Sequence, residues 1–207
     1  MRKYKVLETI LVGLLTIVIC VGVWHIFIFQ PEPEEEETVK DKIFSIIAGF
    51  DFTRPQTFSA VSEINELGVE SVPILQELIK SNSLSDRWAA IILLPGFADH
   101  NPELRPTIIA SLQETADDQN DTLRMLTGAQ LLFLGEKQGI PVLISCLDST
   151  EATHFGEPPE LVKERSLFYL RYYVPFKGET VQAWQEWWET NEDRIVWNEE
   201  KEAFEIQ

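Results

Sequence analysis

Three proline-opened apolar segments recur at nearly equal spacing along this chain of 207 residues, and this periodicity limits the fold more than any other feature. The segments begin at Val72, Arg105 and Ile140, which are 33 and 35 residues apart, and each has proline as its second residue. Proline is tolerated in the first turn of a helix because the N–H that it lacks has no partner within the helix there. We therefore predict that each segment starts a helix.

A second helical pattern follows each of these segments after a polar break. Apolar residues at helical spacing bury one stripe of a helix, and a small residue in the stripe lets the paired helix come close. Repetition at about 35–40 residues is typical of stacked helix pairs, none of which buries its apolar face alone. The pattern consists of a basic residue, a small residue three positions later and a leucine seven positions after the basic one: Arg87/Ala90/Leu94, Arg124/Thr127/Leu131 and Lys163/Ser166/Leu170.

The two patterns together resemble the HEAT family. In that family a proline-opened first helix is joined, through a turn with Asp or Asn, to a second helix with a Val-Arg pair. The second repeat fits this scheme through Asn120–Arg124, and Gly68 and Gly135 stand where such repeats close a helix. The resemblance covers approximately residues 57–174.

The sequence departs from the family at three places. Asp86 stands where the family has an apolar residue, Lys163 replaces arginine, and the third repeat carries an insertion near Asp148–Glu160. The resemblance still implies an all-α fold, a short α-solenoid of about three HEAT-like helix pairs with capping helices. It also implies the usual role of such folds, which is to hold other proteins.

Capping helices are predicted before the first repeat. Asp41–Phe50 and Thr57–Leu67 have the apolar spacing of a helix pair. We expect Phe44, Ile47 and Phe50 to face inward and to cover the open end of the repeats.

The end of the chain is rich in tryptophan. Thr180 is predicted to cap a helix in which Trp184, Trp187 and Trp188 fall at positions i, i+3 and i+4, so at least two indoles share one face. We interpret this face as packing on the last repeat, with an exposed patch that grips a partner or a sugar as the alternative. Residues 194–206 then alternate apolar and polar residues around a polar centre, which predicts a small β-hairpin, with a frayed tail as the alternative.

A long apolar run precedes all of this. The 24 residues Val6–Phe29 contain only two ionisable groups, Glu8 and His25. As a helix the run is ~36 Å long, enough to cross a hydrocarbon core of ~30 Å. No A-x-A-like cleavage site follows it, and Ile19 stands before Cys20 where a lipoprotein signal needs a small residue, so we predict a retained transmembrane helix over residues 6–29.

The flanking charges predict the orientation of this span. Arg2, Lys3 and Lys5 lie before it, whereas Glu34–Glu37 lie after it, which places residues 1–5 in the cytoplasm. Residues 30–40 then form an extended acidic Pro/Glu linker, and residues 41–207 form the helical domain on the outer side. The predicted location is therefore the inner (cytoplasmic) membrane, crossed once.

The net charge of the chain restricts its binding partners, and its two cysteines restrict its disulfides. Residues 30–207 contain 14 Lys and Arg against 33 Asp and Glu, a net charge of −19, which disfavours binding to nucleic acid or anionic lipid. The charge fits a solvated surface, with a basic partner or divalent ions as alternatives. Since Cys20 lies in the predicted span, Cys146 stands alone in the domain, and we predict a buried thiol and no intramolecular disulfide there.

The sequence predicts no catalytic, cofactor-binding or metal-binding residue. Of three histidines, His25 lies in the predicted span, His100 in a polar loop before Pro102, and His154 in the insertion, without metal-ligand spacing. The acidic run Asp117–Asp121 lacks the central glycine and terminal glutamate of an EF-hand loop, so we interpret it as a helix-capping turn.

These observations favour a non-catalytic, membrane-tethered interaction scaffold of the cell envelope. Its partner is predicted to be another envelope protein, and a basic one is among the alternatives that the charge leaves open. One alternative is an enzyme or enzyme subunit, since some HEAT-like proteins are lyases. In this alternative the insertion at Asp148–Glu160 lines a site whose pocket holds His154 and several carboxylates, whereas Glu157 itself is predicted to lie in an exposed turn. The other alternative is a ligand-binding module that uses Trp184, Trp187 and Trp188. The candidate interaction residues are therefore these three tryptophans, His154 and Glu157.

Overall fold

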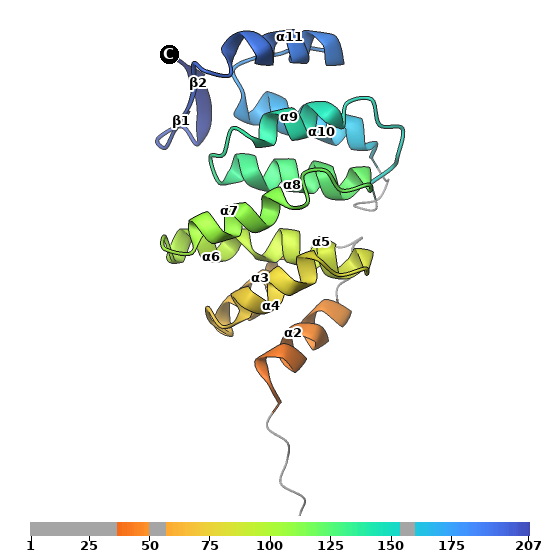
Figure 1. The fold of residues 1–207 in the computed structure, drawn as a ribbon, viewed down its shortest axis with the longest axis vertical. Coiled ribbons are helices and arrows are strands. Elements are labelled where there is room, and N and C mark those ends of the chain that lie inside the picture. The colour runs from red at the N-terminus through yellow and green to blue at the C-terminus, as the bar shows by residue number, and fades with distance from the viewer. Residues whose placement is uncertain (1–36, 50–56, 154–159) are drawn as a thin grey trace, which may run out of the picture. The chain divides into compact units, whose positions relative to one another are not determined.

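The computed structural model describes residues 37–49, 57–153 and 160–207. The predicted span over residues 6–29, most of the predicted linker, Phe50, His154 and Glu157 lie outside these ranges. Within them, no helix has both the length and the apolar character needed to cross a membrane. Residues Thr38–Gln207 form one unit, which is mostly helical and ends in a small antiparallel sheet (Figure 1).

Each proline-opened segment of the sequence lies in the first turn of a helix, as predicted. Pro73, Pro106 and Pro141 are the third, second and third residues of α4, α7 and α9. The basic, small and leucine residues of the second pattern lie on α5, α8 and α10, with Leu94 just after α5. In chain order, the elements are α2 (Val39–Ala48), α3 (Thr57–Glu66), α4 (Ser71–Ile79), α5 (Leu84–Leu93), α6 (Pro95–His100), α7 (Arg105–Gln113), α8 (Asp121–Phe133), α9 (Gly139–Ser145), α10 (Val162–Tyr173), α11 (Val181–Asn191), β1 (Ile195–Asn198) and β2 (Ala203–Ile206).

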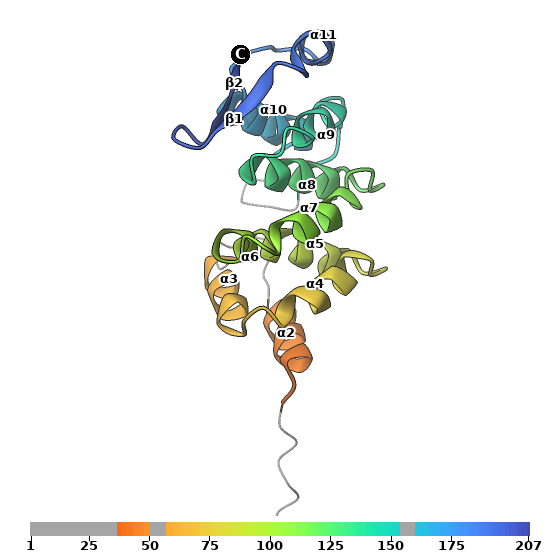
Figure 2. The same ribbon diagram turned by 60° about the vertical axis from the view of Figure 1, so that its left-hand side comes forward.

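The helices pack in pairs, and successive pairs stack on one another (Figures 1 and 2). Within the pairs, α4 packs on α5, α7 on α8, and α9 on α10. Between the pairs, α5 packs on α8 and α8 on α10, so the second helices form one continuous layer. The N-terminal helices α2 and α3 pack against α5, whereas α11 packs against α9 at the other end.

The repeated residues occupy equivalent places in the core. The small residues Ala90, Thr127 and Ser166 are fully buried. The leucines four positions after them, Leu94, Leu131 and Leu170, are fully buried as well. Sequence spacing alone therefore identified the inward face of each second helix.

The helices α8 and α9 approach each other at two glycines. A Cβ added to Gly139 would lie 2.5 Å from the carbonyl oxygen of Gly128, which is closer than any real contact. Gly128 in turn has no room for a Cβ, which would lie 2.8 Å from Leu143 Cγ. The missing side chains let the two backbones come into direct contact.

The helix ends follow the predicted chemistry. Gly68 and Gly135 have φ values of +82° and +70°, and both lie just beyond a helix in the left-handed conformation that glycine adopts without strain. The Asn120 side chain accepts a hydrogen bond from the Leu123 N–H at 3.1 Å, so the predicted capping turn is confirmed. Thr180 caps α11 by accepting from the Ala183 N–H.

Two helices begin or end differently from the prediction. The first begins at Val39 rather than Asp41, because Thr38 and Asp41 form a capping box. Hydrogen bonds from the Thr38 hydroxyl and N–H hold the pKa of the Asp41 carboxyl below its ordinary value. His100, predicted to lie in a loop, is the last residue of α6, because Pro95 at the first helical turn lets the chain continue as a short helix after α5.

The predicted orientation of Phe44 is wrong. Its side chain is 39 % exposed, whereas Ile43 and Ile47 are buried. The two isoleucines are four residues apart and form the inward stripe of α2, so Phe44, one residue further on, is turned away by about 100°. Ile47 faces inward as predicted.

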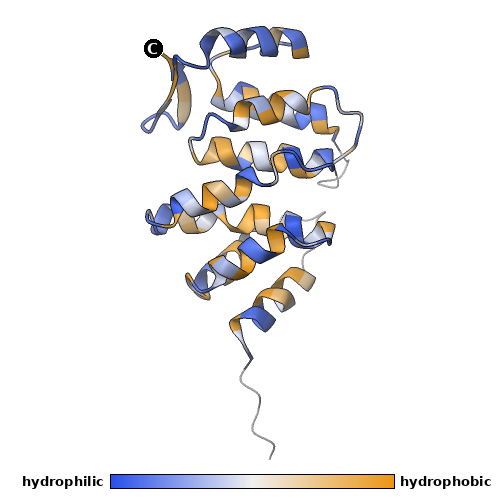
Figure 3. Ribbon diagram, viewed as in Figure 1, coloured by the Kyte–Doolittle hydropathy of each residue, from blue (hydrophilic) through white to orange (hydrophobic). Residues whose placement is uncertain are grey.

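The predicted C-terminal β-hairpin is confirmed. Strands β1 and β2 are antiparallel, with Trp197 opposite Phe204 and Ile195 opposite Ile206. Ile195 and Phe204 are buried, and β2 packs on α10. In Figure 3 the ribbon of the stacked helices before this region carries most of the hydrophobic residues, whereas the ribbon of α11 is largely hydrophilic.

Cys146 is buried immediately after α9, as predicted, and burial raises the pKa of its thiol. Because thiolate is the reactive form, we expect a maleimide to modify Cys146 more than about 100-fold slower than a free thiol at pH 7.5. The rate is measured in a Cys20→Ser background by mass spectrometry. The control is Ser145→Cys with Cys146→Ser, which moves the thiol to the exposed neighbouring position; equal rates would contradict the burial.

Candidate interaction surface

The predicted tryptophan cluster belongs mainly to the core. Trp184 is fully buried, and its Nε1 donates a hydrogen bond to the Gly178 carbonyl at 3.1 Å. Trp187 and Trp188 are partly buried and pack against the same core. The predicted packing role is therefore confirmed for Trp184.

The rings around Trp184 are tightly ordered. Phe176 meets Trp184 edge-on, with centroids 4.9 Å apart, and stacks on Trp187 at 5.3 Å with an interplanar angle of 8°. Such pairs stabilise a fold beyond the area that they bury. A fully buried indole has no surface with which to contact a ligand. Of the three tryptophans on α11, only Trp187 and Trp188 are therefore exposed enough to take part in binding.

The other two predicted interaction residues, His154 and Glu157, lie outside the described residues. The two flanks of that segment are held together by backbone pairing. The Thr153 N–H donates to the Glu160 carbonyl at 2.7 Å, and the Val162 N–H donates to the Glu151 carbonyl at 2.9 Å. The structure thus fixes where the insertion leaves and rejoins the domain, immediately before α10.

The most exposed large aromatic side chains among the described residues lie on α10. Phe168 is 54 % exposed and Tyr172 is 63 % exposed. They line a shallow groove of about 480 Å³ together with Glu164, Leu167 and Arg171. We call these five residues the α10 groove. Their spacing places them along one side of the helix, opposite the buried Ser166 and Leu170.

The exposed rings of the α10 groove rest on an ordered aromatic base. Phe168 stacks on Tyr172, with centroids 6.2 Å apart and an interplanar angle of 21°. Tyr172 meets Tyr173 edge-on at 4.9 Å, and Tyr173 packs against Trp197 of the hairpin. Burial raises the pKa of the Tyr173 phenol. The ordered base restrains the exposed rings, so a partner that binds them has less side-chain entropy to remove.

The charge around the α10 groove is opposite in sign to that of the whole domain. Helix α10 carries Lys163, Arg165 and Arg171 against Glu164, whereas the domain is strongly acidic. The Arg165 guanidinium lies 5.7 Å from the centroid of the Phe168 ring, within cation–π range. Exposed aromatic side chains together with arginine are the composition that protein–protein interfaces favour.

Arg171 is only partly satisfied by its own chain. Its Nη2 donates to the Gly178 carbonyl at 3.2 Å. Its Nε is buried, and in the part of the chain that the structure describes it has no hydrogen-bond partner. The wall of the groove therefore contains a half-buried guanidinium.

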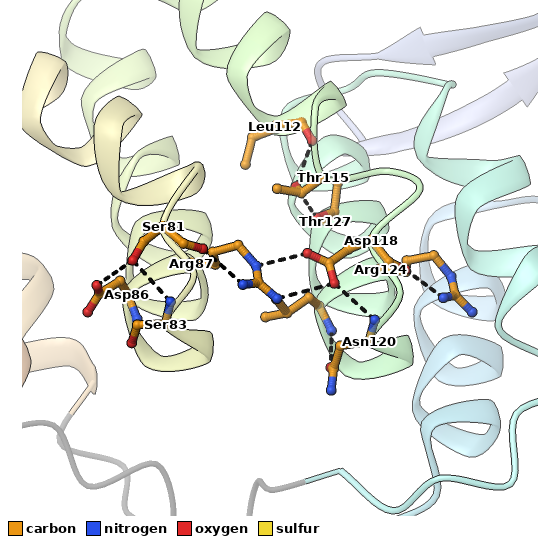
Figure 4. Close-up of polar contacts among 11 residues, drawn as sticks. Ser81, Ser83, Asp86, Arg87, Leu112, Thr115, Asp118, Asn120, Arg124 and Thr127 are labelled. Atoms are coloured by element: carbon orange, nitrogen blue, oxygen red, sulfur yellow. Dashed lines mark hydrogen bonds and ion pairs between the residues drawn. The ribbon is translucent and has the colours of Figure 1, made fainter.

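A ladder of polar contacts ties the stacked pairs together on the side of the turns (Figure 4). Arg87 donates to the Ser81 carbonyl of its own pair at 2.9 Å and to the Asp118 carboxylate of the next pair at 2.9 Å. The Asp118 carbonyl accepts from Arg124 at 2.6 Å, and Arg124 pairs with Asp121. Because α8 is held in this way and α10 packs on α8, the ladder supports the layer that carries the groove.

Within residues 37–49, 57–153 and 160–207, no three His, Cys, Asp or Glu side chains are grouped so that they can hold a metal ion. The groove itself contains one carboxylate, one guanidinium and aromatic rings, which suit the recognition of a protein surface.

Sequence reasoning missed the α10 groove. Lys163, Ser166 and Leu170 match the repeat and predict that α10 belongs to a helix pair. They predict nothing about the face of α10 that points away from that pair. The signal was present, because positions 164, 168 and 172 lie four residues apart and two of them are aromatic. Once Ser166 and Leu170 are assigned to the core, these aromatics must lie on the opposite, outer side.

Comparison of the chain with protein-family models, curated proteins and solved structures finds no match.

Proposed function

We propose that this chain is a non-catalytic, membrane-tethered interaction scaffold of the cell envelope. In this proposal a short HEAT-like α-solenoid of three helix pairs carries a docking surface, the α10 groove, for a protein partner. The observation that carries the proposal is the exposed stack of Phe168 and Tyr172 beside Arg171 on an ordered base.

Several features support the solenoid. The three prolines lie in first turns, the three small residues and three leucines are buried at equivalent places, and the second helices form a continuous layer. Such stacking gives a rigid support, in which each pair is stabilised by its neighbours. A rigid support suits a surface that binds other proteins.

The apolar run Val6–Phe29 supports the tether. With Arg2, Lys3 and Lys5 before it, the run favours an outer location for the domain and a single crossing of the inner membrane. A labelling enzyme fused after Gln207 and restricted to each side of the membrane in turn tests this orientation. Neighbours labelled only from the cytoplasmic side would contradict it.

The side chains of the α10 groove indicate which side chains a partner should carry. The acidic domain as a whole favours a basic envelope protein, but α10 is locally cationic. A partner segment for the groove should therefore bring an apolar or aromatic side chain for Phe168 and Tyr172 together with a carboxylate for Arg171.

The double variant Phe168→Ala/Tyr172→Ala is expected to weaken partner binding at least about 10-fold, because exposed aromatic anchors contribute most to interface energy. Its stability should change by no more than about 1 kcal/mol, since both side chains are largely exposed. The measurement is quantitative capture of envelope proteins by the tagged full chain from its own membranes.

The matched control is Phe133→Ala, at the end of α8, because Phe133 is also large, aromatic and 49 % exposed. The control should capture the same proteins as the unmodified chain. Equal loss in both variants, or no loss in the double variant, would contradict a docking role for the α10 groove.

A further inference from the structure

We infer that the α10 groove binds the same groove of a second copy of this chain, in an antiparallel arrangement about a two-fold axis at Phe168. This inference rests on the proposed docking role of the groove and names its partner. It follows from the order of charged and aromatic side chains along one helix face.

The groove residues are almost symmetric about Phe168. With a rise of 1.5 Å per residue, Glu164 lies ~6 Å from Phe168 along the helix axis in one direction. Arg171 lies ~4.5 Å and Tyr172 ~6 Å from it in the other direction. The negative group and the positive group thus stand on opposite sides of the central ring, at nearly equal distances.

An antiparallel second copy brings opposite charges together. When two α10 helices cross head to tail at Phe168, Glu164 of each copy lies beside Arg171 of the other, which gives two ion pairs. The aromatic rings of Phe168 and Tyr172 then form a continuous layer between the helices. A parallel arrangement would place Glu164 beside Glu164 and Arg171 beside Arg171, and like charges in contact are unfavourable. The charge order therefore selects one orientation.

Both charged groups lie in the groove without an ion pair of their own. In the described ranges neither Glu164 nor Arg171 makes an ion pair, and Glu164 is exposed whereas Arg171 is half-buried. The Nη2 of Arg171 is held by the Gly178 carbonyl, which aligns the guanidinium before a partner arrives. An isologous interface requires such self-complementarity, because the same patch supplies both sides.

The net charge of the chain also favours this face. Two copies with a charge of −17 each repel one another over most of their surfaces. The α10 groove adds little to this repulsion, because Glu164 and Arg171 balance one another within it and Arg165 is paired with Glu160. Self-association is thus least opposed at the place where the exposed aromatic rings lie.

The pairing is expected to be weak in solution. The 12 residues of α10 extend over ~18 Å, so one helix face buries less than the ~800 Å² per partner of a standard interface. An affinity in the micromolar range or weaker is consistent with this size. Anchoring in one membrane would raise the effective concentration and make such an affinity sufficient.

The test uses charge exchange and a disulfide near the two-fold axis. The full-length chain, with Cys20→Ser, carries Leu167→Cys, one residue from the axis, so that the rings of Phe168 and Tyr172 are kept, and mild oxidation in detergent is followed on a non-reducing gel. Leu167→Cys should give a covalent dimer at least 10-fold faster than Phe133→Cys, the exposed control position. Adding Glu164→Arg or Arg171→Glu should each slow the dimer at least 10-fold, because each places like charges opposite one another.

The decisive experiment mixes the Glu164→Arg variant with the Arg171→Glu variant. A tag on one of them distinguishes the mixed dimer from the two self-dimers on the gel. Each variant is repelled by itself, yet in the mixed dimer Glu164→Arg meets Arg171→Glu and the unchanged Glu164 meets the unchanged Arg171. The mixed disulfide should therefore form at least 10-fold faster than either self-disulfide. Recovery in the mixture also rules out misfolding of the variants as the cause of their slow self-pairing.

Three results would overturn the inference. Equal rates at positions 167 and 133, insensitivity to charge, or no recovery in the mixture would each exclude antiparallel self-pairing. Photo-crosslinking from position 168 in cells then separates the two proposals. A crosslink to a different envelope protein retains the docking role and removes the self-pairing, whereas no protein crosslink removes both.

Discussion

Replacing Trp184 with alanine is expected to lower the free energy of unfolding by about 3–5 kcal/mol, the range measured for large aromatic residues removed from a core. Trp184 is fully buried, packs edge-on against Phe176 and Trp187, and donates a hydrogen bond to the Gly178 carbonyl. The substitution removes all of these contacts and leaves the Gly178 carbonyl unpaired. The measurement is urea unfolding of the full chain followed by far-UV circular dichroism.

Two controls separate packing from the hydrogen bond. Trp184→Phe keeps much of the ring volume but removes the donor, so it should cost less than Trp184→Ala. Gln185→Ala, at the exposed neighbouring position, should change stability by about 0.5 kcal/mol or less. A loss below about 1 kcal/mol for Trp184→Ala would mean that the indole is not a core residue, and the tryptophan cluster would again be a candidate binding surface.

The second large effect is expected at Asp118. Its carboxylate accepts from Arg87 Nε at 2.9 Å and from the Asn120 N–H at 2.9 Å, and its side chain is largely buried. Asp118→Ala leaves a partly buried guanidinium without its counter-ion and the capping turn without an acceptor. We expect a loss of about 2–4 kcal/mol, because a buried charge that loses its partner is strongly unfavourable.

A second ion pair between the same two helix pairs is the matched control. Lys80 and Glu114 are 3.0 Å apart, but both side chains are about half exposed or more. Glu114→Ala should therefore cost no more than about 1 kcal/mol. If Asp118→Ala and Glu114→Ala had equal effects in urea unfolding, the ladder in Figure 4 would not be a main support of the stack.

The repeat was predictable because its signals are local. Proline in a first turn, glycine after a helix and an asparagine or threonine cap each act through the backbone of a few neighbouring residues. For this reason Pro73, Gly135 and Asn120 fulfil the expected roles. The helical pairing in turn follows from the buried stripe that each second helix must cover.

The orientation of single aromatic residues was less predictable. The apolar spacing of Asp41–Phe50 predicts that Phe44 faces inward, yet the stripe of Ile43 and Ile47 fixes the rotation of α2 and leaves Phe44 exposed. On a short helix several apolar faces compete, and the choice depends on the neighbouring helices. Neighbouring helices are long-range information that the spacing of one segment does not contain.

The candidate site was the least predictable part. The three tryptophans of the sequence predict a candidate site on α11, but Trp184 of that helix is buried in the core. The most exposed aromatic rings, Phe168 and Tyr172, lie on α10. Both helices contain several aromatic residues, and only the packing of α11 on α9 and of β2 on α10 decides which rings are covered. A binding surface is what the fold leaves uncovered, so it becomes visible only after the core has been assigned.

The most direct test of the central claim is site-specific photo-crosslinking in the cells that make this protein. A photoreactive benzoylphenylalanine is introduced at position 168, at position 172 or at the control position 133 of the full chain. We predict a discrete protein adduct at positions 168 and 172 that is absent at position 133. No adduct at position 168, or the same adducts at position 133, would contradict the account of the α10 groove as the docking surface.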